Sequence, residues 1–458
     1  MALARDGAAP FLNPATMGRI ADHKVAFSVR FYRDERVRIT DFFRAPYQEP
    51  EFEDGDVDRA GFTSAPSSFC AFITLSRLIP EESDGWLASV RASSGRTKLG
   101  LCGATIDSED FDLSADGLSE SRPNGRATTA VDVRRAFSRS SFGPSLSYQL
   151  TDTLSLGASV HMVSTSASLS WETTSIVVDG DQGGFTAHSL SARGGASNLV
   201  ALLGMTWARG IQTFGVSVRL PSIAVSGSAR ASRFTAQSGA PAELVLGTGD
   251  FSAPPPPTFA IGTGVEWPRL LLEVDAITTL GAERAIETQL DSVAYVEDDA
   301  AAAARTERVA ERTRTTTSLR MGGEWFFYPT LSVLAGGRVE PSALVGPIDG
   351  PELRFGQARV HSVAGSLGIG SYGRGAELLV GAELSHRWGQ TVAFTPGHPE
   401  QRFDATPMTD TTVMFVLSGG LSLTSLRRAV RNVEQFGRER IPGLDPSHRA
   451  PDESGPGK

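Results

Sequence analysis

Two stretches of the chain alternate strictly between apolar and polar residues, and this pattern constrains the fold more than any other feature. From Leu154 to Met162 every second residue is apolar, and the residues between them are small or polar, with His161 the largest. The stretch from Phe214 to Leu220 repeats the pattern. A period of two belongs to a β-strand whose two faces differ in polarity. Each stretch therefore predicts a sheet with one apolar face, turned either into a soluble core or into lipid.

Fourteen segments carry strand patterns, separated by connections that alternate in length. Several connections are only a few residues long, whereas others are long: 34–68, 95–133, 170–196, 230–256, 280–314, 341–357 and 389–410. Short turns at one end and long loops at the other are the plan of an outer-membrane barrel. The predicted strands are 25–33, 69–78, 85–94, 134–149, 153–169, 197–208, 211–229, 257–267, 269–279, 315–327, 330–340, 358–371, 375–388 and 411–424.

Aromatic residues recur beside the short turns, as in Tyr148, Trp207, Trp267, Trp325 and Tyr372. Such rings collect at the boundary between membrane and water, because the ring is apolar while its hydroxyl or N–H stays hydrated. The polar strand faces carry charges, which a barrel lumen tolerates and a lipid face does not. Both observations favour an apolar face that points outward into lipid.

Composition supports this fold class and excludes others. The 48 glycines suit a protein of strands and turns, and the net charge of −9 argues against a nucleic-acid partner. No apolar run is long enough for a transmembrane helix, and residues 1–6 lack the pattern of a secretory signal. Cys70 and Cys102 are interpreted first as two unrelated residues, and second as a disulfide formed in an oxidising compartment.

Motifs for enzyme chemistry or metal binding do not hold. Gly368–Gly373 matches G-x-G-x-x-G, but a strand pattern follows where a dinucleotide site needs a helix. Asp54–Asp58 resembles half of a calcium loop without its glycine and glutamate. No G-x-S-x-G elbow occurs, and the two cysteines have no C-x-x-C spacing. We therefore expect no enzyme activity, no cofactor and no metal.

Several short motifs, in order along the chain, resemble the FadL/TodX-type outer-membrane transporters of long-chain fatty acids and hydrocarbons. Asn13-Pro14-Ala15 is similar to the Asn-Pro-Ala segment of that family's N-terminal hatch. The other matching segments are Ala65–Phe69, Leu154–Gly157, Phe214–Ser222 with Gly227, and Pro256–Gly262. The resemblance implies a 14-stranded barrel whose lumen the hatch closes. It also implies that apolar substrate enters from outside, rearranges the hatch and leaves through a side opening in the wall.

The chain is thus predicted to be an all-β protein, a 14-stranded antiparallel transmembrane β-barrel. A short N-terminal hatch (residues 1–22) precedes the barrel (23–425), and a charged, disordered tail (426–458) follows it. The expected function is passive uptake of hydrophobic small molecules across the bacterial outer membrane, by a monomer surrounded by lipid and lipopolysaccharide. Asn13, Pro14 and Ala15 are candidate hatch residues, although an ordinary turn at the base of the barrel is equally compatible with them.

The candidate lumen contacts for substrate are charged or titratable residues on the polar strand faces. Arg219 and Arg320 are candidates because arginine pairs well with carboxylates, and each has the alternative role of an internal ion-pair residue. The full set is His161, Arg219, Arg320 and Glu324. Three other functions remain open: a general porin, a barrel with a structural or adhesive role, and a soluble or surface β-sandwich.

Overall fold

The computed structural model describes residues 8–20, 24–43, 55–78, 94–122, 125–179, 182–294, 305–345, 359–373, 375–394 and 403–422. Two short helical segments, α1 (Ala9–Leu12) and η1 (Pro14–Arg19), precede the strands, and a third, η2 (Leu75–Arg77), follows β2. None of the helices in these residues has the length and apolar character needed to cross a membrane.

The described chain also contains eighteen strands. In its first half they are β1 (Lys24–Phe43), β2 (Gly55–Thr74), β3 (Thr97–Arg122), β4 (Gly125–Gln149), β5 (Leu154–Asp179), β6 (Gln182–Arg209), β7 (Gln212–Arg219), β8 (Ile223–Gln237) and β9 (Glu243–Ser252). In its second half they are β10 (Thr258–Trp267), β11 (Leu270–Thr279), β12 (Glu283–Ala294), β13 (Arg305–Arg312), β14 (Thr316–Tyr328), β15 (Leu331–Glu340), β16 (Arg359–Gly373), β17 (Ala376–Phe394) and β18 (Phe403–Ser422).

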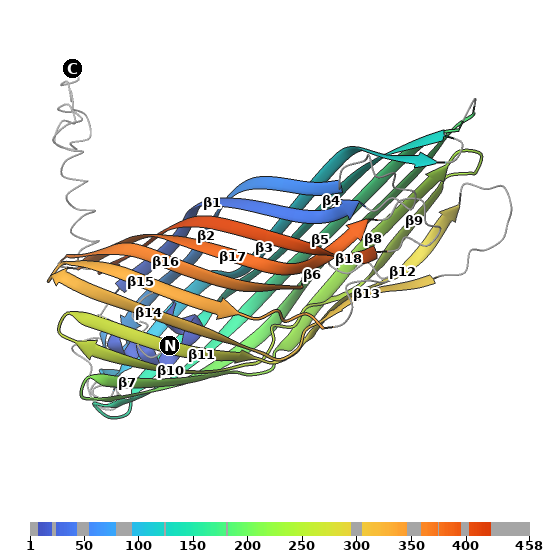
Figure 1. Ribbon diagram of the computed structural model, residues 1–458. Helices are drawn as coiled ribbons and strands as arrows, with labels where there is room; N and C mark the ends of the chain where they lie inside the picture. Colours follow the sequence, from blue (N-terminus) through green and yellow to red (C-terminus); the bar gives the residue numbers. More distant parts are fainter. Residues whose placement is uncertain are drawn as a thin grey trace, which may run out of the picture.

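These strands form a closed barrel with 14 positions around its wall. Strands β1–β6 and β15–β18 each fill one position, and the remaining eight share four positions end to end: β7 with β8, β10 with β9, β11 with β12 and β14 with β13. The ring closes because β1 pairs with both β2 and β18. The predicted 14-stranded antiparallel barrel is confirmed (Figure 1).

Several of the predicted long loops are wrong, because these intervals are strands. They continue the apolar strand segments at the end of the barrel away from the short turns. The interval 95–133 contains β3 and the start of β4, and 170–196 contains the ends of β5 and β6, which stay paired up to Asp179 and Gln182. Similarly, 34–68 and 230–256 contain parts of β1, β2, β8 and β9. Both faces of these extensions are rich in polar residues, so the period-two signal fades there although the ladder continues. Residues 85–93 of the predicted strand 85–94 lie outside the described residues, and β3 takes that wall position.

An apolar belt surrounds the lower part of the barrel, nearest to the short turns. On β5 the outward residues Leu156, Val160 and Met162 are exposed, and above them the outward positions become serine, as at Ser164 and Ser166. A tilted strand crosses an apolar band about 25 Å tall in roughly 10 residues, which is close to the stretch from Leu154 to Met162. The exposed apolar face therefore has the height of a bilayer core.

The aromatic residues lie at the lower edge of this belt. Tyr148, Trp207, Trp267 and Trp325 are exposed on the outside, as expected for a girdle. Tyr372 differs, because its hydroxyl donates a hydrogen bond inward to Glu324 Oε1. The turn between β6 and β7 is Gly210-Ile211, where Gly210 has a positive φ of 59° that other residues rarely adopt.

A disulfide joins Cys70 of β2 to Cys102 of β3, so the interpretation of these cysteines as unrelated residues is wrong. The two residues are direct cross-strand partners with Cα atoms 4.2 Å apart, and both are fully buried. The sequence left this pairing open because the strand register of β3 was not recognised.

We predict that replacing both cysteines by serine destabilises the barrel. The bond closes a loop of 32 residues, and a constraint of that length on the unfolded chain is worth about 3–4 kcal/mol. Urea unfolding of Cys70→Ser/Cys102→Ser in lipid vesicles measures the loss, and wild-type protein unfolded with a reductant is the matched control. The same midpoint in the oxidised wild type and the double variant would contradict this prediction.

Candidate functional site

The segment from Ala9 to Ile20 lies inside the barrel at its short-turn end, where the N-terminal residues are drawn in Figure 1. It packs against β3, β4, β5 and β6, and its residues Ala9, Asn13, Ala15 and Met17 are fully buried. A proline at the start of each helical segment suits a compact turn, because Pro fixes φ and supplies no N–H that would need a partner. We call residues 9–20 the lumen segment.

Asn13 fixes the lumen segment to itself and to the wall. Its Oδ1 accepts a hydrogen bond from Ala15 N at 3.2 Å, which caps the helical turn that begins at Pro14. Its Nδ2 donates to the carbonyl oxygen of Met205 on β6 at 3.2 Å. An amide serves both roles because it carries a donor and an acceptor.

Wall hydroxyls satisfy the backbone carbonyls of the lumen segment. Ser147 Oγ on β4 donates to Ala15 O at 3.1 Å, and Ser159 Oγ on β5 donates to Pro10 O at 3.0 Å. At the far end of the segment, Arg19 Nη1 lies 2.7 Å from Glu266 Oε1 on β10. These contacts attach the segment to β4, β5 and β10 of the wall.

Two wall glycines allow the lumen segment to approach closely. A Cβ atom at Gly157 would lie 2.3 Å from Ala15 N, and one at Gly204 would lie 2.1 Å from Asn13 Oδ1. Any side chain at either position would displace the segment. The segment also packs against the disulfide, in a buried cluster composed of Ala9, Met17, Ile20, Ala26, Cys70, Phe72 and Cys102.

The wall is interrupted at four adjacent positions, at residues 220–222, 253–257, 280–282 and 313–315. The interruption between β9 and β10 contains Pro254–Pro257, which lack the N–H groups that a sheet ladder needs. Here the chain turns into the lumen: Phe251 and Ala253 are buried, and Ala253 O accepts a hydrogen bond from Arg139 Nη2 at 3.5 Å.

Phe251 organises an apolar cluster inside the barrel. Its ring covers Gly194, where a Cβ would lie 2.5 Å from Phe251 Cγ. The members of this cluster come from the consecutively paired strands β4, β5, β6, β8, β9 and β12 and from the loop after β9: Phe137, Ala167, Ala192, Ala196, Ala229, Phe251, Ala253 and Ile286. The cluster narrows the lumen beside a cavity of about 490 Å³, of which Phe137 and Ala167 also form part of the wall.

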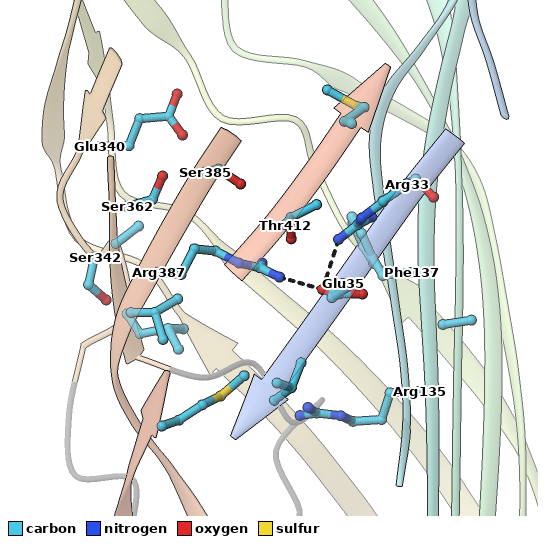
Figure 2. A pocket seen from close by; sticks show the side chains of 18 of the residues that line it. Arg33, Glu35, Arg135, Phe137, Glu340, Ser342, Ser362, Ser385, Arg387 and Thr412 are labelled. Carbon is cyan, nitrogen blue, oxygen red and sulfur yellow. Dashed lines mark hydrogen bonds and ion pairs between the residues drawn. The ribbon is translucent and has the colours of Figure 1, made fainter. Parts of the chain in front are cut away.

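The cavity is lined by charged side chains (Figure 2). On one side Arg387 of β17 lies between two carboxylates: it is 2.7 Å from Glu35 Oε1 and also contacts Asp410. Arg33 reaches the same Glu35 oxygen at 2.9 Å. On β15, Arg338 lies 2.9 Å from Glu383 of β17.

Among the described lining residues, β4 and β12 contribute two arginines to the cavity. Arg284 of β12 lies over the Phe137 ring, with 4.5 Å between its guanidinium carbon and the ring centroid, and Arg139 lies at 5.2 Å. Arg135 of β4 also faces this cavity. Such cation–π contacts hold guanidinium groups in place beside the apolar cluster.

Solved structures match the chain, whereas no protein-family model and no curated sequence does. A FadL homologue of Pseudomonas aeruginosa is 14% identical and matches over 92% of this chain and 95% of its own, with a TM-score of 0.57. The P. putida toluene transporter TodX is 13% identical over 91% of this chain and 94% of its own, with a TM-score of 0.56. The monoaromatic hydrocarbon channel CymD is 12% identical over 92% and 94%, with a TM-score of 0.52. The chain has the FadL/TodX fold.

The resemblance drawn from Asn13-Pro14-Ala15 and the other motifs is thereby confirmed at the level of the fold. The matching structures are channels and transporters. Within the described part of this FadL/TodX barrel, no cluster of His, Cys, Asp or Glu could hold a metal ion.

The four predicted lumen contacts do not form one cluster, although His161 and Arg219 lie close enough to interact electrostatically. His161 is buried beside the lumen segment, with its ring 4.9 Å from that of Phe11. Arg219 ends β7 at the wall interruption. Arg320 pairs with Glu340 at 2.9 Å, and Glu324 accepts a hydrogen bond from Ser332 Oγ at 2.6 Å near the short turns. None of the four lines the charged cavity.

The cavity residues were missed for a physical reason. Glu35 and Arg284 fall in intervals that were predicted to be long loops. Arg387 lies at the very end of the predicted strand 375–388, next to its last residue, Trp388. The usable signal was charge at inward positions of extended strands.

Elsewhere above the belt, burial, and then the nearby Arg233 guanidinium, lower the pKa of the His188 imidazole, so this side chain adds no positive charge at neutral pH.

Proposed function

We propose that this protein is an outer-membrane channel that takes up hydrophobic small molecules, such as long-chain fatty acids, by passive diffusion. The observation that carries the proposal is the position of residues 9–20 in the lumen at its short-turn end, where the wall holds them through Asn13 and Arg19. An open porin would have no use for such a plug. We therefore assign a hatch role to Asn13, Pro14 and Ala15.

The outside of the barrel supports a location in the outer membrane. The exposed apolar belt suits direct contact with lipid and lipopolysaccharide, and the girdle at its lower edge suits a membrane boundary. The Cys70–Cys102 disulfide is compatible with passage through an oxidising periplasm. We expect a monomer, because the described strands already form a closed ring.

We place the side exit of this channel between β8 and β10. The β7–β10 ladder ends at the pair Arg219 and Thr258, and the β8–β9 ladder begins only at Ala229 and Gly249. The inward turn of residues 253–257 lies in the interval between them. His161 and Arg219, which lie on the same side of the lumen, are proposed to border the route between the hatch and this exit.

Uptake by whole cells tests the proposal. A lipopolysaccharide leaflet resists apolar solutes, so cells that lack a channel of this fold provide a low background. We expect cells that make the protein to take up radiolabelled oleate or toluene several-fold faster than cells with an empty vector. A heat-modifiable shift on unboiled gels confirms that the barrel is folded. Equal uptake at a confirmed level of folded barrel would contradict transport and favour a structural or adhesive role.

A further inference from the structure

Two arginines lie opposite each other on the outer surface of the barrel wall. Arg193 of β6 and Arg230 of β8 are direct cross-strand partners, and both are exposed. The residues beside them point the other way, because Ala192 and Ala229 are buried in the apolar cluster inside the barrel. Like charges placed directly opposite each other destabilise a sheet. The pair is therefore a candidate site for an anion that comes from outside the chain.

The described part of the chain does not neutralise this pair. No ion pair or side-chain hydrogen bond of the described residues involves the guanidinium group of Arg193 or of Arg230. Their other cross-strand partners carry hydroxyl groups, Ser168 on β5 and Thr248 on β9. The nearest exposed carboxylate on the neighbouring strand is that of Asp250, in a diagonal position two residues from Thr248. One carboxylate can offset at most one of the two positive charges.

The arginine pair lies above the apolar belt, at the end of the barrel away from the short turns. On β6, Arg193 is six residues from Leu199, the nearest exposed apolar residue of the belt on this strand. At about 3.3 Å per residue along a strand tilted by about 40°, this separation places it roughly 15 Å above the belt. In outer-membrane barrels the short turns face the periplasm, so the pair lies on the cell-surface side. Its height is that of the large headgroups of lipopolysaccharide.

Small residues separate the belt from the arginine pair. Gly195 and Ser228 form the outward pair next to the arginines, and Ser197 and Ser226 form the next one towards the belt. A Cβ atom at Gly195 would have no atom within 4 Å, so the surface there is open. The outer face of residues 193–199 and 223–230, which we call the β6–β8 strip, thus has an apolar zone, a zone of small residues and a guanidinium pair.

We propose that the β6–β8 strip binds lipid A, the phosphorylated glycolipid part of lipopolysaccharide, with a phosphate between Arg193 and Arg230. Phosphate oxygens accept paired hydrogen bonds from guanidinium groups and supply the negative charge that the pair needs. The saccharide covers the small residues, and the acyl chains contact Leu199 and Ile223, which are direct partners with exposed fractions of 37% and 66%. This inference rests on the outer-membrane location in the proposed function and not on the compound that is transported.

A matched pair of glycolipids tests the phosphate contact. Native mass spectrometry of the full chain, released from a neutral detergent, measures how many lipid A molecules bind and how tightly. Lipid A from which both phosphates have been removed is the comparison, because it retains the saccharide and the acyl chains. We expect the phosphorylated form to bind at least about tenfold more tightly, as one charge-assisted hydrogen bond would provide. Equal binding of the two forms would overturn the proposal, as would complete displacement of lipid A by millimolar inorganic phosphate.

Substitutions of the arginines locate the site. Arg193→Gln and Arg230→Gln are each expected to weaken lipid A binding about fivefold, as the loss of one basic side chain near an anionic membrane surface would. Arg193→Lys retains the charge and should retain most of the binding. Arg96→Gln is the control, because it removes an exposed arginine beside Leu150 at the short-turn end. Unchanged affinity in both folded glutamine variants would overturn the site.

Stability in the absence of lipid A tests whether the pair instead has a structural role. In phosphatidylcholine vesicles the glutamine variants should unfold at the same denaturant concentration as the wild type or at a higher one, because opposed like charges repel. A lower midpoint in both variants would show that the arginines stabilise the wall by themselves, which would contradict the proposal.

The outcomes separate the lipid A site from the uptake function. Phosphate-dependent lipid A binding by a folded barrel that gives cells no uptake of oleate or toluene would contradict uptake and retain the site. Uptake by cells together with equal binding of both forms of lipid A would retain uptake and overturn the site.

Discussion

Replacing Gly204 by alanine is expected to open the channel. The added Cβ would lie 2.1 Å from Asn13 Oδ1, so Asn13 has to leave its position against β6. Overpacking of this kind costs about 1–3 kcal/mol. A shift of that size changes the ratio of displaced to seated lumen segment by roughly 5- to 150-fold.

The measurement is the ion current of purified barrel in a planar bilayer, where wild-type protein should conduct little and Gly204→Ala considerably more. Gly195→Ala is a control on the same strand, because a Cβ at Gly195 would have no atom within 4 Å. Gly157→Ala, which would clash with Ala15 N, should repeat the effect on a different strand. Equal currents in the wild type and in both folded clash variants would show that the segment does not close the lumen.

Placing arginine in the apolar belt is expected to destabilise the barrel strongly. Leu367 on β16 is 68% exposed and pairs with Ala382, in the middle of the outward apolar stretch from Leu378 to Leu384 on β17. An arginine at mid-membrane on the lipid face of a barrel costs about 2–4 kcal/mol. On a surface in water the same substitution typically changes stability by less than about 0.5 kcal/mol.

A matched position in water gives the control for this experiment. Ile176 on β5 is 55% exposed but lies far above the belt, so Ile176→Arg should leave the free energy of unfolding nearly unchanged. Denaturant unfolding of both variants in lipid vesicles, followed by tryptophan fluorescence, measures the difference. Equal effects at the two positions would indicate that Leu367 faces water, which the β-sandwich alternative requires.

The sequence was sufficient to predict the barrel strands wherever the two faces of a strand meet different solvents. Between Leu154 and Met162 lipid outside and a polar lumen inside impose alternation, and the strand, its faces and the short turn were all predictable. Above Met162 both faces can be polar, so nothing in the residues distinguishes a solvated strand from a loop. That is why the upper parts of β3–β6 and β12 were predicted as loops.

The candidate site was predictable only in part. Asn13, Pro14 and Ala15 were singled out by their resemblance to the Asn-Pro-Ala segment of the FadL/TodX hatch, and an amide followed by a proline suits the turn found there. The charged cavity was not, because its charged residues come from β1, β4, β12, β15 and β17 and meet only once the ring closes. Cys70 and Cys102 likewise became a pair only through the register of β2 with β3.

The contacts of the lumen segment have a consequence for assembly. Arg19 meets Glu266, which is 247 residues further along the chain, and the wall itself closes through β1 and β18. Such distant partners have to be in place before the segment gains anything by ordering. Residues 9–20 are therefore expected to be among the last to settle, although they precede the strands in the chain, and a hatch of the kind proposed would leave a newly inserted barrel open for a time. The time for which the lumen stays open would depend on how fast residues 9–20 dock against β4–β6. Selection can therefore act on the rate of this docking step.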